Sequence, residues 1–163
     1  MMIMGEKTTR KQLDHQLPWW IANEGQRWMI TVNCKQRGVN QLCKPELLEI
    51  FKDSIEYRNK ADMWRCSLFV LMPDHLHMIV SLRPEQALAK VIGDWKRWMA
   101  NKHGIKWQSN FYDHRIRNNE SLYEKADYLF MNPVRAGLCD DYHHWKYLWV
   151  DKYNGEGLVD LLR

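Results

Sequence analysis

Two apolar runs separated by only two residues constrain the fold of this chain most strongly. The first, at 63–72, reads "MWRCSLFVLM" and is apolar on both faces of an extended chain, which predicts a buried strand. Pro73 and Asp74 then form a tight connection, and "HLHMIVSL" at 75–82 predicts the next strand. The chain is therefore expected to fold around a sheet with a strongly apolar core.

The surrounding segments predict a mixed order of strands and helices. Further strands are expected at 27–33 and, as a short strand or extended segment, at 106–117. Helices are expected from Pro45 onward, over 84–103 and over 120–131. This order suits an α+β fold of the ferredoxin-like plan, which is an antiparallel sheet with helices packed on one face.

The length of 163 residues fits one domain, and the composition limits the class of protein. We expect a basic N-terminal segment at 1–26, the main domain at 27–138 and a loop-like C-terminal tail at 139–163. The net charge of +4 favours an anionic partner. The four cysteines form no CxxC pair, which indicates free thiols in a reducing compartment. No run reaches the ~18 apolar residues of a membrane span, so an intracellular, cytoplasmic protein is expected.

His75 and His77 lie one residue apart in the second run and point to the same face of a strand, because side chains alternate. The opposite face belongs to the core and consists of Leu76, Met78, Val80 and Leu82. Two neutral imidazoles on one strand face are a natural pair of metal ligands. The alternative is two histidines satisfied by hydrogen bonds beneath a helix, and the pair alone leaves both interpretations open.

The predicted helix at 120–131 carries a phenol and an amide on one polar stripe. Tyr128 and Asn132 are one helical turn apart, so an amide oxygen that binds a cation would place the phenol beside it. The alternative is an ordinary exposed tyrosine and a helix-terminal asparagine. Tyr123, with Asp127 one turn further on, is a rival nucleophile that lies nearer the apolar stripe.

A divalent cation would make this combination of residues chemically useful. A phenol has a pKa of about 10 and is a poor nucleophile at neutral pH. A cation that binds the phosphate polarises the phosphoryl oxygen and orients the leaving group. The tyrosine oxygen then displaces a deoxyribose oxygen and forms a covalent phosphotyrosine, so the step can run backward and rejoin strands.

Taken in order, these motifs resemble a known family. "HLH" has the His-hydrophobic-His form of the HUH endonuclease superfamily, and "LMPDHLHMIV" matches the histidine strand of the tyrosine transposases associated with repetitive extragenic palindromes (REP). "FYDHRIRNNESLYEKADYLFMNPVRAGL", at 111–138, resembles their tyrosine-helix motif nearly throughout. Those proteins are single-tyrosine HUH transposases, similar to the IS200-like transposases that move single-stranded DNA. The resemblance covers about residues 27–138.

This resemblance implies the HUH endonuclease fold and the nicking and strand transfer of single-stranded DNA. On the matching motifs, His75 and His77 correspond to metal ligands, Tyr128 to the nucleophile and Asn132 to a polar third ligand. The family also implies a divalent ion, Mg²⁺ or Mn²⁺, no nucleotide cofactor, REP-type hairpins as substrates, and action as a monomer or a homodimer. The stretches "HQLPWWIANEGQ" and "HHWKYLWVDKY" depart from the family pattern.

Basic residues beside aromatic rings are candidates for DNA contacts, because cations bind phosphates while rings stack on bases. The candidates are Lys96, Arg97, Lys106, Arg115 and Arg117. Alternation would send Arg115 and Arg117 to one face just before the tyrosine helix. For each of the five, an ordinary solvated charge is the alternative interpretation.

Two other functions stand as alternatives to a metal-dependent DNA-nicking enzyme. A protein that binds repeat-DNA hairpins without strand transfer would tolerate loss of the histidines and the tyrosine, and all of these are present. A zinc hydrolase is disfavoured, because "HLHMIV" lacks the Asp-His that hydrolase motifs of the His-x-His-x-Asp-His kind supply.

Overall fold

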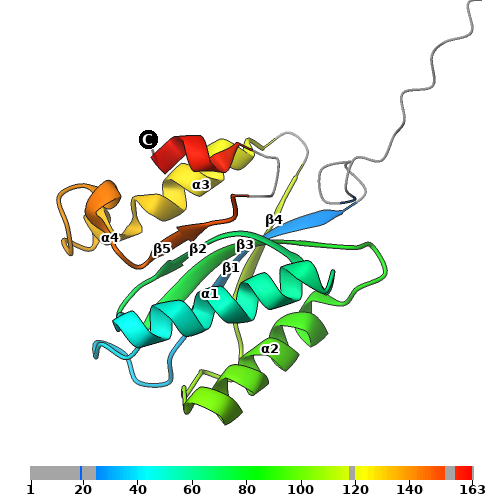
Figure 1. The fold of residues 1–163 in the computed structure, drawn as a ribbon, viewed down its shortest axis with the longest axis horizontal. Helices are drawn as coiled ribbons and strands as arrows, with labels where there is room; N and C mark the ends of the chain where they lie inside the picture. The colour runs from blue at the N-terminus through cyan, green and yellow to red at the C-terminus, as the bar shows by residue number, and fades with distance from the viewer. Residues whose placement is uncertain (1–18, 20–24, 118–119, 153–156, 163) are drawn as a thin grey trace, which may run out of the picture.

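The computed structural model describes residue 19 and residues 25–117, 120–152 and 157–162. Its centre is a five-stranded sheet in the order β4-β1-β3-β2-β5, and every neighbouring pair is antiparallel (Figure 1). The strands are β1 (Gln26–Asn33), β2 (Arg65–Leu71), β3 (His75–Leu82), β4 (Tyr112–Ile116) and β5 (Leu148–Val150). Strands β1 to β4, with a helix after β1 and after β3, form the ferredoxin-like arrangement that the sequence predicts.

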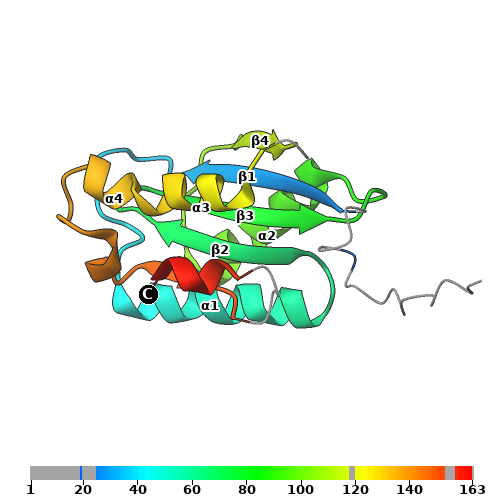
Figure 2. The same ribbon diagram turned by 90° about the horizontal axis from the view of Figure 1, so that it is seen from above.

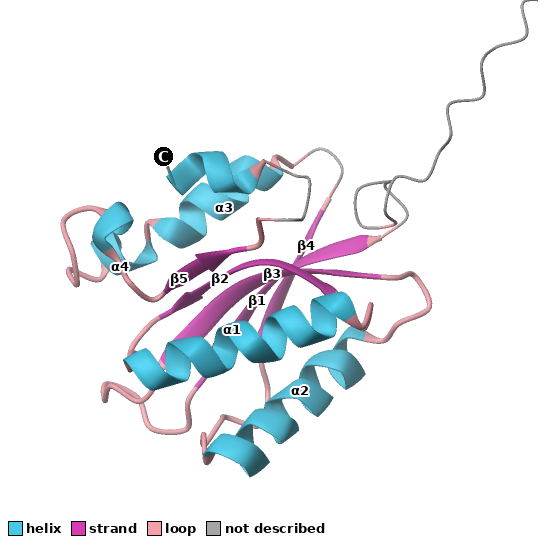
Figure 3. Ribbon diagram, in the orientation of Figure 1, coloured by secondary structure: helices cyan, strands magenta, loops and turns pink. Residues whose placement is uncertain are grey.

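Helices α1 (Pro45–Lys60) and α2 (Leu88–His103) lie side by side on one face of the sheet (Figure 3). Phe51 of α1 packs edge-on against Trp95 of α2, with ring centroids 5.9 Å apart. The strand residues that alternate toward these helices are buried: Ile30, Val32, Leu76, Met78, Val80 and Leu82. The predicted core face of β3 is therefore confirmed.

A third helix, α3 (Leu122–Phe130), packs on the opposite face, and the short α4 (Asn132–Arg135) follows it (Figure 2). Leu129 and Phe130 of α3 belong to the same apolar cluster as Val70 of β2 and Ile79 of β3. The predicted one-sided arrangement of helices thus applies to α1 and α2, while α3 covers the other side. The physical reason is that β2 is buried at every position and needs cover on both faces.

The helix boundaries differ from the predicted ones where side chains compete with the helical backbone. Helix α2 begins at Leu88 because residues 83–86 form a turn, in which the backbone N–H of Arg83 donates to the Gln86 side chain. Helix α3 begins after Ser121, whose hydroxyl caps it. The predicted helix over 120–131 is interrupted at Met131, and α4 continues in a new direction.

The C-terminal region is more ordered than the loop-like tail that the sequence predicts. It contains the short 3₁₀ helix η1 (Tyr142–His144), β5, and a second 3₁₀ helix, η2 (Leu158–Leu162). Trp149 of β5 stacks on Phe69 of β2 with ring centroids 5.4 Å apart, which adds a fifth strand to the sheet. The loop prediction is therefore wrong for these elements, because aromatic packing against β2 offsets the weak local strand signal.

Three other expectations concern the N-terminal segment, the cysteines and membrane-spanning helices. The predicted N-terminal segment at 1–26 lies almost entirely outside the described residues. All four cysteines are free thiols, as expected. Within the described ranges, the helices are too short or too polar to span a membrane.

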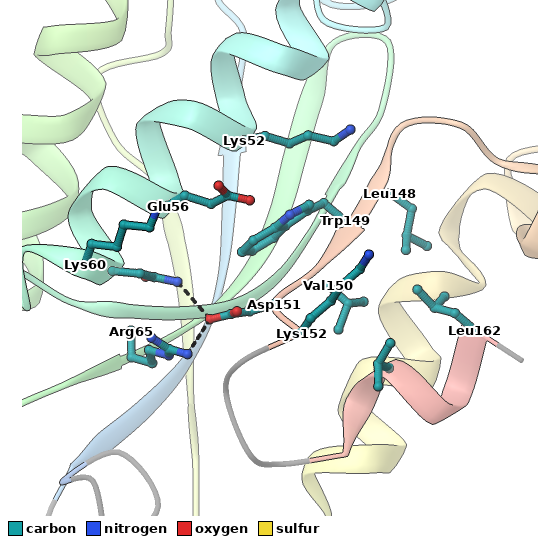
Figure 4. A pocket seen from close by; sticks show the side chains of 12 residues that line it. Lys52, Glu56, Lys60, Arg65, Leu148, Trp149, Val150, Asp151, Lys152 and Leu162 are labelled. Atoms are coloured by element: carbon teal, nitrogen blue, oxygen red, sulfur yellow. Dashed lines mark hydrogen bonds and ion pairs between the residues drawn. The ribbon is translucent and has the colours of Figure 1, made fainter.

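A buried ion pair fixes the end of β5 to the rest of the protein (Figure 4). The Asp151 carboxylate accepts from Arg65 of β2 at 2.6 Å and from the Asn59 amide of α1 at 3.1 Å. All three side chains are buried. The Asn59 amide also bonds to the backbone N–H and carbonyl of Cys66, so the cluster joins α1, β2 and the C-terminal region.

Replacing Asp151 with alanine is expected to lower the free energy of unfolding by about 3–5 kcal/mol, because it leaves the buried Arg65 charge without this carboxylate. Urea denaturation followed by circular dichroism measures the change. Lys152→Ala, at the exposed neighbouring position, is the matched control and should stay within about 0.5 kcal/mol of the wild type. Equal transition midpoints for the two variants would contradict the role given to Asp151.

Candidate active site

His75 and His77 lie on the sheet face that α3 covers. In the antiparallel register, His77 stands opposite Thr31 of β1 and Val70 of β2, and Val70 contributes to the cluster beneath α3. The two imidazole rings meet edge to face, with centroids 4.9 Å apart. The expectation that both histidines share one face, away from the α1 and α2 core, is therefore confirmed.

Each imidazole is anchored through its Nδ1 atom. Nδ1 of His75 bonds to the Asp74 carboxylate at 2.7 Å, and Nδ1 of His77 bonds to the Thr31 hydroxyl at 2.8 Å. Neither Nε2 atom forms a hydrogen bond within the part of the chain that the structure describes. With Nδ1 as the protonated donor, each ring presents an unprotonated Nε2, which is the arrangement typical of metal-binding histidines.

Asp74 joins His75 to the loop that follows β1. Its carboxylate accepts from the Gly38 backbone N–H at 2.7 Å and pairs with Arg37 at 3.3 Å. Burial by itself raises the pKa of Asp74, but the hydrogen bonds from Gly38 and His75 and the charge of Arg37 outweigh burial and lower this pKa below its ordinary value. Asp74 therefore remains an anion and holds the His75 ring in one orientation.

His77 is neutral at pH 7. Burial is the largest cause and, together with repulsion from His75, Arg135 and Arg37, lowers its pKa from 6.5 to about 3. The neutral imidazole is the form that binds a metal ion. The contribution of Arg135 also places α4 within electrostatic reach of His77.

Tyr128 lies on the exposed side of α3. The helix buries Ala126, Leu129 and Phe130 toward the sheet, and this leaves Tyr128 54% exposed. The Arg135 guanidinium of α4 lies over the phenol ring, with its Cζ atom 4.2 Å from the ring centroid. A cation over an aromatic face is an attractive contact, so the tyrosine ring is held although it is accessible.

Asn132 is bonded to the same arginine. Arg135 Nη2 donates to Asn132 Oδ1 at 3.1 Å and to the backbone carbonyl of Tyr128 at 2.5 Å. The Asn132 amide nitrogen in turn donates to the Leu129 carbonyl at 3.2 Å, which fixes the orientation of the amide group. The junction of α3 and α4 thus brings the predicted nucleophile and the predicted third ligand together.

Tyr123, the rival nucleophile, lies in different surroundings. It is five positions before Tyr128, which rotates it about 140° around the helix. Its hydroxyl lies against the C-terminal region: a Cβ atom added to Gly157 would be 2.6 Å from Tyr123 Oη. The geometry therefore favours Tyr128, which contacts Arg135, over Tyr123, which contacts the segment before η2.

The candidate ligands have the chemistry that a divalent cation requires. Two Nε2 atoms and the Asn132 amide oxygen combine nitrogen and oxygen donors, which suits ions such as Mn²⁺ or Mg²⁺ when phosphate oxygens complete the coordination. Among the described residues, His, Cys, Asp and Glu side chains form no cluster of three that could hold a metal ion.

Lys96 has a structural role in place of the predicted phosphate contact. The side chain is buried, and its Nζ donates to three successive carbonyl oxygens, at 2.9, 3.0 and 3.1 Å, in residues 108–110. An ammonium group has three N–H donors, so none is left for DNA. The prediction for Lys96 is wrong because the sequence did not reveal that this loop folds back over α2.

Arg97 and Lys106 remain exposed and, with Lys35, line a groove of about 550 Å³ at the C-terminal end of α2. We call these three residues the basic groove. The backbone of Lys35 is bonded to that of Lys106 at 2.7 Å, which joins the two loops that form it. Asn33, two positions before Lys35, is the register partner of His75. The basic groove therefore adjoins the end of the sheet at which His75 lies.

Arg115 and Arg117 are both exposed, and Arg115 does not share a sheet face with the histidines. Arg115 of β4 stands opposite Trp28, which packs with the α1 and α2 core on the other side of the sheet. Arg117 follows the end of β4, at the approach to α3. A contact from Arg115 to DNA at the histidine face would have to pass around the edge strand.

Sequence reasoning missed Thr31, Arg37, Asp74 and the contacts of Arg135. For Asp74 there was a usable signal, since a carboxylate beside a ligand histidine commonly orients the ring. Thr31 and Arg37 reach the site only through the pairing of β1 with β3 and the loop after β1, and this register has no local sequence signal.

The fold and the placement of these residues define the class of protein. The family model described as "Transposase IS200 like" matches residues 26–129, a range that includes β1 to β4, the histidine pair and Tyr128. This is a transposase domain in which the candidate ligands lie on a central strand and the candidate nucleophile on a covering helix. The chain belongs to the IS200-like transposase family.

Individual relatives narrow the comparison further. The chain is 25% identical over 141 residues to the REP-associated tyrosine transposase of Escherichia coli (strain K12), covering 85% of this chain and 84% of that protein. A protein of Haemophilus influenzae is 25% identical over 95 residues, covering 47% of this chain and 53% of the relative. A solved structure of a REP-associated tyrosine transposase bound to a REP hairpin has a TM-score of 0.66 and 24% identity, covering 77% of this chain and 76% of that one. This likeness confirms the α+β fold.

Proposed function

We propose that this protein nicks single-stranded DNA and transfers the cut strand in a metal-dependent reaction that passes through a covalent link to Tyr128. The observation that carries the proposal is the pair of imidazoles with anchored Nδ1 atoms and uncommitted Nε2 atoms, on the sheet face that the tyrosine helix covers. Membership of the IS200-like transposase family supports the same class of reaction.

In this reaction His75 and His77, with Asn132 as a third donor, would hold a divalent ion. A bound Mg²⁺ or Mn²⁺ would polarise the phosphoryl oxygen and orient the leaving group. The Tyr128 oxygen attacks phosphorus and loses its proton to water. A tyrosine O–P bond forms, the P–O bond to deoxyribose breaks, and the released sugar oxygen takes a proton from solvent. Attack by another strand end on the phosphotyrosine reverses these bond changes and rejoins DNA.

The proposed substrate is single-stranded DNA that carries a REP-type hairpin. The Escherichia coli relative and the hairpin-bound relative share most of the length of this chain, which supports a substrate of the same kind. The exposed lysines and arginine of the basic groove supply positive charge beside the histidine end of the sheet. A protein that only binds such hairpins is the second candidate function, and the intact His75, His77 and Tyr128 argue against it.

Incubation with a labelled hairpin oligonucleotide tests the proposed function directly. In Mn²⁺ or Mg²⁺ we expect a covalent protein–DNA adduct on a denaturing gel, and we expect EDTA to prevent it. Tight hairpin binding without an adduct in either ion would support the binding-only function and contradict strand transfer.

Removing the charges of the basic groove is expected to weaken DNA binding in a way that depends on salt. The triple variant Lys35→Gln, Arg97→Gln and Lys106→Gln should reduce the slope of log affinity against log salt by about 2 to 3, because each phosphate contact contributes about 0.7–0.9 to that slope. Fluorescence anisotropy with the hairpin at several salt concentrations measures it. The control is a triple variant with the same number of altered charges at a different place, the pocket drawn in Figure 4. Its substitutions are Lys52→Gln, Lys60→Gln and Lys152→Gln. Equal slopes for both triples would rule out a specific role for the groove.

A further inference from the structure

We propose that Arg135 is a positioning residue that couples the nucleophile to the metal site: it holds the Tyr128 ring and competes with the divalent ion for the Asn132 amide oxygen. The inference rests on the proposed function, since it concerns the same site. It adds a residue outside the range that the family model matches, which ends at 129.

The contacts of Arg135 are the first argument. Its guanidinium lies over the Tyr128 ring at 4.2 Å and donates to the Tyr128 carbonyl at 2.5 Å. The same Nη2 atom donates to Asn132 Oδ1 at 3.1 Å, the only oxygen of that amide group. One side chain therefore engages both the candidate nucleophile and the candidate third ligand.

The charge of Arg135 is the second argument. A guanidinium is always protonated, so it repels a divalent ion that approaches Asn132 Oδ1. The ion and Arg135 thus oppose each other at one oxygen atom, so binding of the ion displaces the guanidinium from Asn132.

Exposure of Arg135 is the third argument. The residue is exposed to solvent, and its planar fork of donors matches the geometry of a phosphate group. An incoming DNA phosphate can draw the guanidinium away from Asn132. Arrival of the substrate would then free the amide oxygen for the ion, while the guanidinium stays over the phenol ring and keeps it in position.

Mn²⁺ affinity, measured by isothermal titration calorimetry without DNA, tests the competition. Arg135→Gln should bind Mn²⁺ roughly threefold to tenfold more tightly than the wild type, the size expected for removing one charge near a divalent ion at a water-exposed site. Arg135→Lys keeps the positive charge but loses the planar guanidinium group, and it should give a smaller gain in Mn²⁺ affinity. In an Asn132→Ala background, Arg135→Gln should give a much smaller gain, because the contested oxygen is absent and only the repulsion at longer range is relieved.

The rate of adduct formation at saturating Mn²⁺ tests the positioning of the phenol. Arg135→Gln should form the covalent adduct about tenfold more slowly despite tighter ion binding, because the Tyr128 ring has lost its contact. If Arg135 had only a structural role, Arg135→Gln would lower the Mn²⁺ affinity, the rate of adduct formation and the melting temperature of the protein at the same time. If Arg135→Gln binds Mn²⁺ no more tightly than the wild type, the inference is overturned. If the wild type itself does not bind Mn²⁺, the proposed metal site on which the inference rests is overturned.

Discussion

Replacement of Tyr128 by phenylalanine is expected to abolish the covalent protein–DNA adduct and to leave hairpin binding within about twofold of the wild-type affinity. The change removes one oxygen atom and keeps the aromatic ring over which the Arg135 guanidinium lies. Loss of a catalytic nucleophile typically lowers the rate by about 10⁴-fold or more. Denaturing gels of a labelled hairpin in Mn²⁺ measure the adduct, and fluorescence anisotropy measures binding.

Tyr123→Phe is the matched control for this experiment. It removes the same atom from the same helix, but at a hydroxyl that lies against Gly157 in the C-terminal region. We expect adduct formation close to the wild-type rate. If Tyr123→Phe lost the adduct and Tyr128→Phe kept it, Tyr123 would be the nucleophile in place of Tyr128. If both variants kept it, phosphotyrosine chemistry on α3 would be wrong.

Replacement of His77 by alanine is expected to weaken Mn²⁺ binding by about 100-fold or more and to suppress adduct formation to a similar degree. Changing a group that only orients a ligand costs about 10–100-fold in metal affinity, and loss of the ligand itself should cost at least as much. The imidazole is already neutral at pH 7, because its pKa lies at about 3, so the wild type needs no deprotonation step at His77. Calorimetric titration with Mn²⁺ measures the affinity.

His114→Ala provides the control for the histidine substitution. His114 lies on β4, opposite Met29 of β1, and its Nε2 is bonded to the Glu120 carboxylate at 2.9 Å. That nitrogen is occupied, so we expect Mn²⁺ affinity to stay within about twofold of the wild type. Comparable losses in His77→Ala and His114→Ala would show that metal binding does not depend on the His75 and His77 pair.

Together the two principal substitutions separate the candidate functions. An enzyme should lose the adduct in Tyr128→Phe and His77→Ala while it continues to bind the hairpin. A binding-only protein would show no adduct in the wild type, and neither substitution would alter its affinity for DNA. The distinction depends on measuring binding and covalent chemistry separately with the same oligonucleotide.

The elements with strong local signals could be predicted from the sequence. The bounds of β3 at 75–82 and the start of α1 at Pro45 follow from alternation and from proline chemistry, and the structure confirms both. The alternation also placed His75 and His77 on one face. Lys96 shows where this reasoning fails, because its exposure depends on a loop at 108–110 that packs against α2 from beyond the helix.

The sequence by itself determined the ferredoxin-like order of elements and the shared face of the two histidines. These properties depend on residues near one another in the chain, where the periods of strands and helices apply. Only the tertiary structure decided that α3 covers the histidine face, that Thr31 and Asp74 direct the Nε2 atoms, and that Arg135 links Tyr128 to Asn132. The physical reason is that strand register and the burial of both sheet faces bring distant residues together, and local periodicity carries no information about these contacts.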